Sequence, residues 1–125
     1  MRWLDLSSLL QVRGQIDINP RQIEEPKFGF EVLKSLKIFV SGRVQGVFFR
    51  SYTKRFSERL NDVTGYVKNL HDGRVEIYAE GSEASLRALA EWAKIEGSPA
   101  SKIQGTEEIW EDLPTRKFGD FRITF

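Results

Sequence analysis

The chain has 125 residues, of which 40% are apolar and 30% are charged. That length is typical of a single domain, and that composition is typical of a folded globular protein and not of a disordered one. The chain carries 19 basic and 18 acidic residues, a formal net charge of +1, so no strong overall field directs it to nucleic acid or to an anionic membrane. If the chain binds an anion, a few neighbouring residues must therefore supply the positive charge and the hydrogen-bond donors.

The composition also excludes several kinds of chemistry. The chain has no cysteine, which excludes a disulfide framework, a thiolate metal site and a cysteine nucleophile. Its single histidine, His71, excludes a metal site with several histidine ligands. No apolar run approaches the ~18 residues that span a bilayer, and the N-terminus is a poor signal peptide. We therefore predict a soluble cytoplasmic protein with no membrane partner.

Residues 1–33 differ in pattern from the rest of the chain. Leu6 and Leu10 belong to an apolar set with the spacing of a short amphipathic helix, and two prolines then interrupt a polar stretch. We predict an N-terminal extension at 1–33, partly ordered or an appended arm, followed by a domain at 34–125.

The predicted domain begins with a strand that is followed by a helix. From Ser35 to Ser41, apolar residues recur at every second position, which is the period of a strand. Residues 42–46 interrupt this pattern. Apolar residues then recur on one helical face, at Phe49, Tyr52, Phe56 and Leu60. This helix is expected to end near Asn61 and Asp62.

Two further strands and a second helix follow. Residues 63–69 and 74–80 have the composition of strands, and the Asp-Gly pair between them is a strong signal for a hairpin. Ser82 is a suitable N-cap for a helix, and Gly97 marks its end. The apolar face of that helix consists of Leu86, Leu89, Ala90 and Ala93.

The order of the predicted elements indicates the fold. Residues 103–110 form a further strand, and apolar residues alternate from Phe121 to Phe125 as a short last one. The order β-α-β-β-α-β with an extra C-terminal strand predicts an α+β, ferredoxin-like two-layer sandwich. In that fold both helices cover one face of an antiparallel sheet.

The turn between the first strand and the first helix is the main candidate site. It reads GRVQGVFFR from Gly42 to Arg50. The glycines let the backbone curl so that successive N–H groups converge, and the following helix presents its positive end to the same point. Arg50 adds a planar fork of donors at the start of that helix. The turn favours a dianion such as phosphate, although a tight connection with a solvated arginine fits the spacing equally well.

Other polar residues give weaker signals. His71 lies in the predicted hairpin turn, where an exposed turn residue is the ordinary interpretation. The acidic pairs at 24–25, 107–108 and 111–112 lack the spacing of a metal-binding loop and are expected on the solvated surface. Asn69 ends a strand immediately before the hairpin, where a capping or turn role is the ordinary expectation.

Two segments of the domain resemble the signatures of the acylphosphatase family. The sequence at 42–50 resembles the first, and GYVKNLHDGRV at 65–75, followed by Gly81, resembles the second. The resemblance covers about residues 35–125. The extension at 1–33 departs from the family pattern, because typical members begin near the first predicted strand.

The resemblance implies a small, metal-free enzyme that hydrolyses acyl phosphates to a carboxylate and inorganic phosphate. It implies catalytic roles for Arg50, which binds the phosphoryl group, and for Asn69, which positions the attacking water. The backbone amides of the turn are implied to bind the same phosphoryl group, at Val44, Gln45, Gly46, Val47, Phe48 and Phe49. It implies no metal and no cofactor. The implied partners are a small acyl phosphate and inorganic phosphate, as product and inhibitor.

The chemistry of acyl phosphates is compatible with so sparse a site. A carboxylate leaving group, whose conjugate acid has a pKa of about 4, departs without a general acid. The transfer itself needs mostly positioning and charge stabilisation.

Two other functions on the same topology stay open: a non-catalytic anion-sensing or regulatory module, and an RRM-like nucleic-acid-binding domain. The strand at 74–78 has one aromatic residue and an acid, and the net charge is close to zero, which disfavours the RRM-like function. We expect a monomer that binds no nucleic acid.

Overall fold

The computed structural model describes residues 32–125. The predicted helix around Leu6 and Leu10, the acidic pair at 24–25 and almost all of the predicted extension at 1–33 lie outside the described residues.

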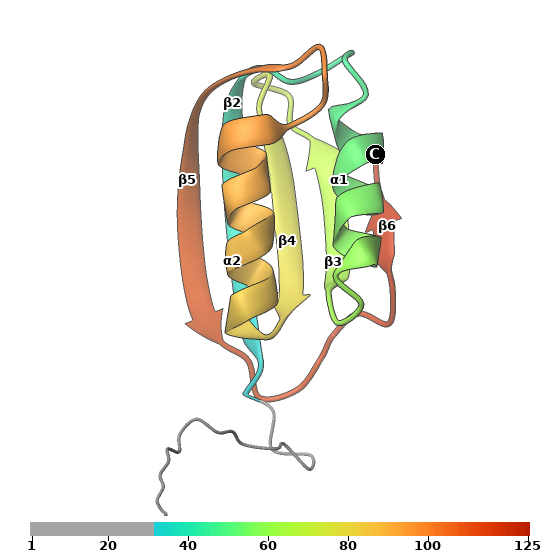
Figure 1. Cartoon of the computed structure of the whole chain (residues 1–125), viewed down its shortest axis with the longest axis vertical. Coiled ribbons are helices and arrows are strands. Elements are labelled where there is room, and N and C mark those ends of the chain that lie inside the picture. Colours follow the sequence, from blue (N-terminus) through green and yellow to red (C-terminus); the bar gives the residue numbers. More distant parts are fainter. Residues whose placement is uncertain (1–31) are drawn as a thin grey trace, which may run out of the picture. The chain divides into compact units, whose positions relative to one another are not determined.

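The described residues form one sheet with two helices on one of its faces (Figure 1). In chain order the elements are β2 (Lys34–Arg43), α1 (Phe49–Arg59), β3 (Thr64–Asn69), β4 (Val75–Gly81), α2 (Glu83–Glu91), the π-helical turn η1 (Trp92–Glu96), β5 (Lys102–Asp112) and β6 (Phe121–Ile123). The strands lie in the order β5-β2-β4-β3-β6. The pairings are antiparallel except that β6 lies parallel to β3. The predicted α+β, ferredoxin-like sandwich with an extra C-terminal strand is confirmed.

The core lies between the sheet and the helices. The alternation predicted for β2 places three residues on this face, where each pairs with an apolar residue of β4. The six are fully buried: Leu36, Ile38, Val40, Val75, Ile77 and Ala79. Helix α2 adds Leu86 and Leu89, which are also fully buried. Burying one large apolar side chain stabilises the fold by about 1.5–3 kcal/mol, so this layer fixes both helices against the sheet.

The helical segment after β4 stops at Gly97, as predicted, but α2 ends at Glu91 and the π-helical turn η1 forms the rest. The N–H of Gly97 donates to the carbonyl of Trp92 at 2.9 Å, which closes the wider turn. Gly97 has φ +63°, a conformation that side chains with a Cβ rarely adopt. The ring of Trp92 packs 5.4 Å from the rings of both Phe49 and Phe56, and so joins this turn to α1.

The opposite face of the sheet carries an aromatic cluster of Tyr66, Tyr78 and Phe118, with ring centroids 5.5–5.6 Å apart. The hydroxyl of Tyr66 donates to Glu76 at 2.5 Å, and that of Tyr78 donates to Glu80 at 2.8 Å. Burial and the Glu80 carboxylate raise the pKa of Tyr78 to about 12. Because these rings pack against one another and the two tyrosine hydroxyls bind carboxylates, this face does not favour the RRM-like alternative.

Candidate functional site

The turn between β2 and α1 has the backbone geometry of an anion cradle. Gly46 (φ +74°) and Phe48 (φ +64°) are left-handed, whereas Val47 between them has a negative φ. Such alternation directs successive N–H groups toward one point, an arrangement known as a nest. Within residues 32–125, no backbone carbonyl accepts a hydrogen bond from the amides of residues 45–48. Helix α1 has neither a capping side chain nor an acidic residue in its first turn, so its positive end is also available.

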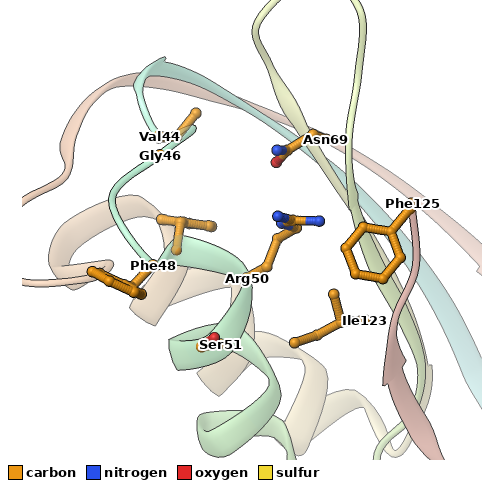
Figure 2. A pocket seen from close by; sticks show the side chains of 9 residues that line it. Val44, Gly46, Phe48, Arg50, Ser51, Asn69, Ile123 and Phe125 are labelled. Atoms are coloured by element: carbon orange, nitrogen blue, oxygen red, sulfur yellow. The ribbon is translucent and has the colours of Figure 1, made fainter.

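One cavity brings this turn together with Arg50 and Asn69. Its volume is about 320 Å³, and it is lined by Val44, Gly46, Phe48, Phe49, Arg50, Ser51, Asn69, Ile123 and Phe125. Figure 2 shows the guanidinium of Arg50 between the amide of Asn69 and the ring of Phe125. The two side chains that the sequence motifs indicate, one from α1 and one from β3, therefore line the same space.

Asn69 carries the clearest sign that something else belongs in this cavity. It is the last residue of β3, where it pairs with Val75 on the helix-covered face. Its Oδ1 atom is buried and accepts no hydrogen bond within the described part of the chain. Leaving a buried acceptor unpaired costs about 1–3 kcal/mol, so a water or a ligand is expected to supply the missing donor.

Two predicted phosphate-binding residues, Gln45 and Val47, do not line the cavity with their side chains. The side-chain amide of Gln45 donates to the carbonyls of Leu70 at 2.8 Å and Arg74 at 3.0 Å. The carbonyl of Val47, whose side chain is buried, accepts a hydrogen bond from the hydroxyl of Ser98 at 2.8 Å. The bonds from Gln45 attach the turn to the hairpin that follows Asn69. The bond from Ser98 attaches the turn to the segment that follows η1. Only the backbone N–H groups of these two residues are left to bind an anion.

The last strand ends earlier than the sequence predicts, before Phe125. Strand β6 ends at Ile123, and the N–H of Thr124 donates to the carbonyl of Val67 at 2.9 Å. Phe125 lies beyond the strand and is 94% exposed, with its ring centroid 5.0 Å from the guanidinium carbon of Arg50. The alternation at 121–125 indicates which face these residues share, but not that the last one leaves the sheet and lines the cavity. Ser51 and Ile123 are further lining residues that the sequence motifs do not indicate.

The remaining polar residues lie where the sequence predicts. His71 is exposed in the hairpin turn, and the acidic pairs at 107–108 and 111–112 are on the surface. Among residues 32–125, no three acidic or histidine side chains lie close enough together to hold a metal ion. None of the helices in that range is long and apolar enough to cross a membrane.

The fold and the site together define a class: an α+β protein with a ferredoxin-like sandwich, in which a nest of amides, an arginine and an asparagine surround one cavity. The comparisons with known proteins agree with this class. A family model described as Acylphosphatase matches residues 36–123. The chain therefore belongs to the acylphosphatase family.

Individual relatives support this membership. An acylphosphatase of Anaeromyxobacter dehalogenans is 46% identical over 89 residues, which cover 71% of this chain and 92% of the relative. Acylphosphatase-1 of Gallus gallus is 43% identical over 96 residues, which cover 76% of this chain and 96% of the relative. The crystal structure of an acylphosphatase from Bacillus subtilis matches with a TM-score of 0.68 at 37% identity, over 74% of this chain and 99% of that one.

Proposed function

We propose that this enzyme hydrolyses acyl phosphates to a carboxylate and inorganic phosphate by direct attack of a water on the phosphoryl group. The observation that carries this mechanism is the shared cavity, where the nest, Arg50 and Asn69, whose Oδ1 atom has no partner in the described fold, border one space. Family membership supports the substrate class, and the geometry supports the division of roles among the residues.

In the proposed complex, the phosphoryl group lies in the turn. The backbone amides of residues 44–49 and the positive end of α1 bind its oxygens, and the guanidinium of Arg50 donates to them as a planar fork. These donors are fixed by the fold before the substrate arrives, so charge that develops on the phosphoryl oxygens is stabilised without further rearrangement.

The water is held by Asn69. Its Oδ1 accepts a hydrogen bond from one O–H of the water. This bond orients the water so that a lone pair on its oxygen points toward phosphorus. A new P–O bond forms as the bond between phosphorus and the acyl oxygen breaks, and the electron pair of that bond leaves with the carboxylate. A proton of the water passes to a phosphoryl oxygen, so the products are the carboxylate and dihydrogen phosphate. The leaving carboxylate is a weak base, so no general acid is required.

The experiment that tests the function is the release of phosphate from acetyl phosphate with and without a chelator. We expect the same rate in both conditions, and little release from an alkyl phosphate monoester, whose alkoxide leaves poorly without an acid. Loss of activity on chelation that a divalent metal restores would contradict the metal-free mechanism. A folded chain that releases no phosphate from acetyl phosphate would contradict the function.

We also propose that the chain acts as a cytoplasmic monomer without nucleic acid; the formal net charge of +1 supports the absence of nucleic-acid binding. Light scattering at assay concentrations tests the monomer, cell fractionation tests the location, and added RNA or DNA is expected to leave turnover unchanged. A dimer mass, recovery with membranes, or inhibition by nucleic acid would contradict the corresponding part.

A further inference from the structure

Ser98 is a buried polar residue in the connection between η1 and β5. It is 1% exposed, and its hydroxyl donates to the carbonyl of Val47 at 2.8 Å. Its own carbonyl accepts two hydrogen bonds from Ser101, one from the N–H at 3.0 Å and one from the hydroxyl at 2.7 Å. These bonds hold Ser98 in place at the end of the sheet where the turn between β2 and α1 also lies (Figure 1).

The bond from Ser98 fixes the direction of the amide that follows Val47. The peptide between Val47 and Phe48 is trans, so the carbonyl of Val47 and the N–H of Phe48 point in opposite directions. Because the carbonyl points to Ser98, the N–H points away from the connection. Among the described residues no backbone carbonyl accepts a hydrogen bond from this N–H, and Phe48 lines the cavity. This orientation therefore leaves the N–H of Phe48 free to serve the nest.

Phe48 is strained in this orientation. Its φ of +64° is a left-handed conformation that a bulky side chain rarely adopts. Rotation of the peptide between Val47 and Phe48 changes ψ of the first and φ of the second, as in the difference between type II and type I turns, and returns φ of Phe48 to negative values. The rotated peptide would present a carbonyl oxygen to the nest in place of an N–H, and that oxygen repels an anion. The Ser98 hydroxyl opposes the rotation, because the rotated carbonyl loses its buried donor.

We propose that Ser98 is a positioning residue for phosphate binding. Its hydroxyl keeps the peptide between Val47 and Phe48 in the orientation that presents an N–H to the phosphoryl group. The proposal rests on the proposed binding of the phosphoryl group in the turn, and it gives a role to a residue that lies outside both sequence motifs. The N–H binds phosphoryl oxygens before and during the transfer, so Ser98 contributes to affinity at least as much as to turnover.

The test measures the Kd of inorganic phosphate and the amide NMR resonance of Phe48 in the parent chain, in Ser98→Ala and in Ser101→Ala. Ser101→Ala is the matched control, because it removes a hydroxyl from the same connection but leaves the donor to Val47 in place. An amide that binds phosphate changes its resonance during the titration, so the Phe48 amide reports its own orientation separately from overall stability. Values of kcat and KM for acetyl phosphate are measured on the same chains.

We expect phosphate affinity to fall about threefold to tenfold in Ser98→Ala, which is the effect of one hydrogen bond on the balance between two peptide orientations. The Phe48 resonance should lose most of its response to phosphate, and kcat should fall no more than the affinity does. Ser101→Ala should keep the parent affinity and the parent response. A folded Ser98→Ala chain with the parent affinity and the parent Phe48 response would overturn the proposal, and so would an equal loss of affinity in Ser101→Ala.

Phe48→Gly in the Ser98→Ala background tests the rotation itself. Glycine adopts positive φ without strain, so this change removes the cause of the rotation. The double variant should recover part of the phosphate affinity that Ser98→Ala loses, and a double variant that recovers none would contradict the rotation. A parent chain that binds phosphate but releases none from acetyl phosphate would instead overturn the proposed hydrolysis, whereas a parent chain that binds no phosphate would overturn both proposals.

Discussion

Arg50 and Asn69 contact the proposed substrate at different stages of the reaction. In the proposed mechanism, Arg50 binds the phosphoryl group both before and during the transfer, because the guanidinium faces the same oxygens throughout. Asn69 is proposed to bind the water, whose orientation matters most when the new P–O bond forms. Removing the Arg50 side chain is therefore expected to weaken both phosphate affinity and turnover, whereas removing the Asn69 side chain is expected to lower mainly turnover.

For Arg50→Ala we expect weak binding of inorganic phosphate and almost no turnover. Arg50→Lys should recover little of either, because an ammonium group cannot reproduce the bidentate fork of the guanidinium. Inhibition by inorganic phosphate and kcat on acetyl phosphate measure the two effects. The variant is expected to stay folded, since Arg50 is only partly buried and its guanidinium lies over the exposed ring of Phe125. An alanine variant that keeps the parent affinity for phosphate would remove Arg50 from the phosphate site.

For Asn69→Ala we expect kcat to fall about a hundredfold, because losing one oriented hydrogen bond to a reacting group costs on the order of 3 kcal/mol. Phosphate affinity should stay near the parent value. Stability should not fall, because the Oδ1 atom has no hydrogen-bond partner in the described fold and its removal relieves a buried unpaired acceptor. Thermal unfolding and phosphate titration of the same variant separate a catalytic effect from a loosened hairpin. Full kcat in a folded Asn69→Ala variant would mean that Asn69 is only a turn residue.

At the scale of elements, local periodicity predicts most of the fold. The alternation in β2, the Asp-Gly turn before β4 and the stop at Gly97 are properties of short segments, and all three are confirmed. The motifs also indicate Arg50 and Asn69, whose placement in one cavity is a property of the topology.

The parts that sequence cannot predict depend on where distant segments meet. The side chain of Gln45 reaches two carbonyls of the β3–β4 hairpin because the turn packs against that hairpin. The bond from Ser98 to Val47 joins residues 51 positions apart. The departure of Phe125 from β6 likewise follows from contacts at the chain end and not from its apolar character.

The link between the turn and the hairpin leads to a third prediction. Gln45→Met keeps the length of the side chain but removes the donor to the carbonyls of Leu70 and Arg74. We expect kcat to fall between about tenfold and a hundredfold, because small displacements of reacting groups have effects of that size. Phosphate affinity should change less than kcat, since the link positions the water held by Asn69 relative to the phosphoryl group.

The control for this prediction is Ser98→Ala, which removes the other side-chain bond to the turn without touching the hairpin. It should weaken phosphate binding at least as much as it lowers kcat. A double-mutant cycle gives the decisive comparison: if Gln45 acts through Asn69, then Gln45→Met lowers kcat little further in the Asn69→Ala background. Independent, additive losses in kcat would contradict a link between the two residues.

At the scale of the whole molecule, the proposed catalytic unit is the part of the chain that the family model matches. That model covers residues 36–123, and the residues that line the cavity fall between Val44 and Phe125. Leu33 belongs to this unit as well, because its carbonyl accepts a hydrogen bond from the N–H of Leu113 at 3.1 Å. A chain that begins at Val32 therefore keeps both the site and the contacts at the start of β2.

The last prediction is that this shortened chain binds inorganic phosphate and turns over acetyl phosphate as the full chain does. At ~100 times its dissociation constant a ligand stabilises the folded state by about 2.7 kcal/mol, provided that it binds only that state. For a domain of this size, 1 kcal/mol raises Tm by about 4–8 °C, so saturating phosphate should raise Tm by about 10 °C or more in both chains. Arg50→Ala, measured in the same buffers, corrects for the general effect of salt on stability, since it lacks the fork but keeps the fold. A Tm that phosphate leaves unchanged in both chains would contradict the cradle. A shift in the full chain alone would mean that residues 1–31 contribute to the site, because every other residue is common to the two chains.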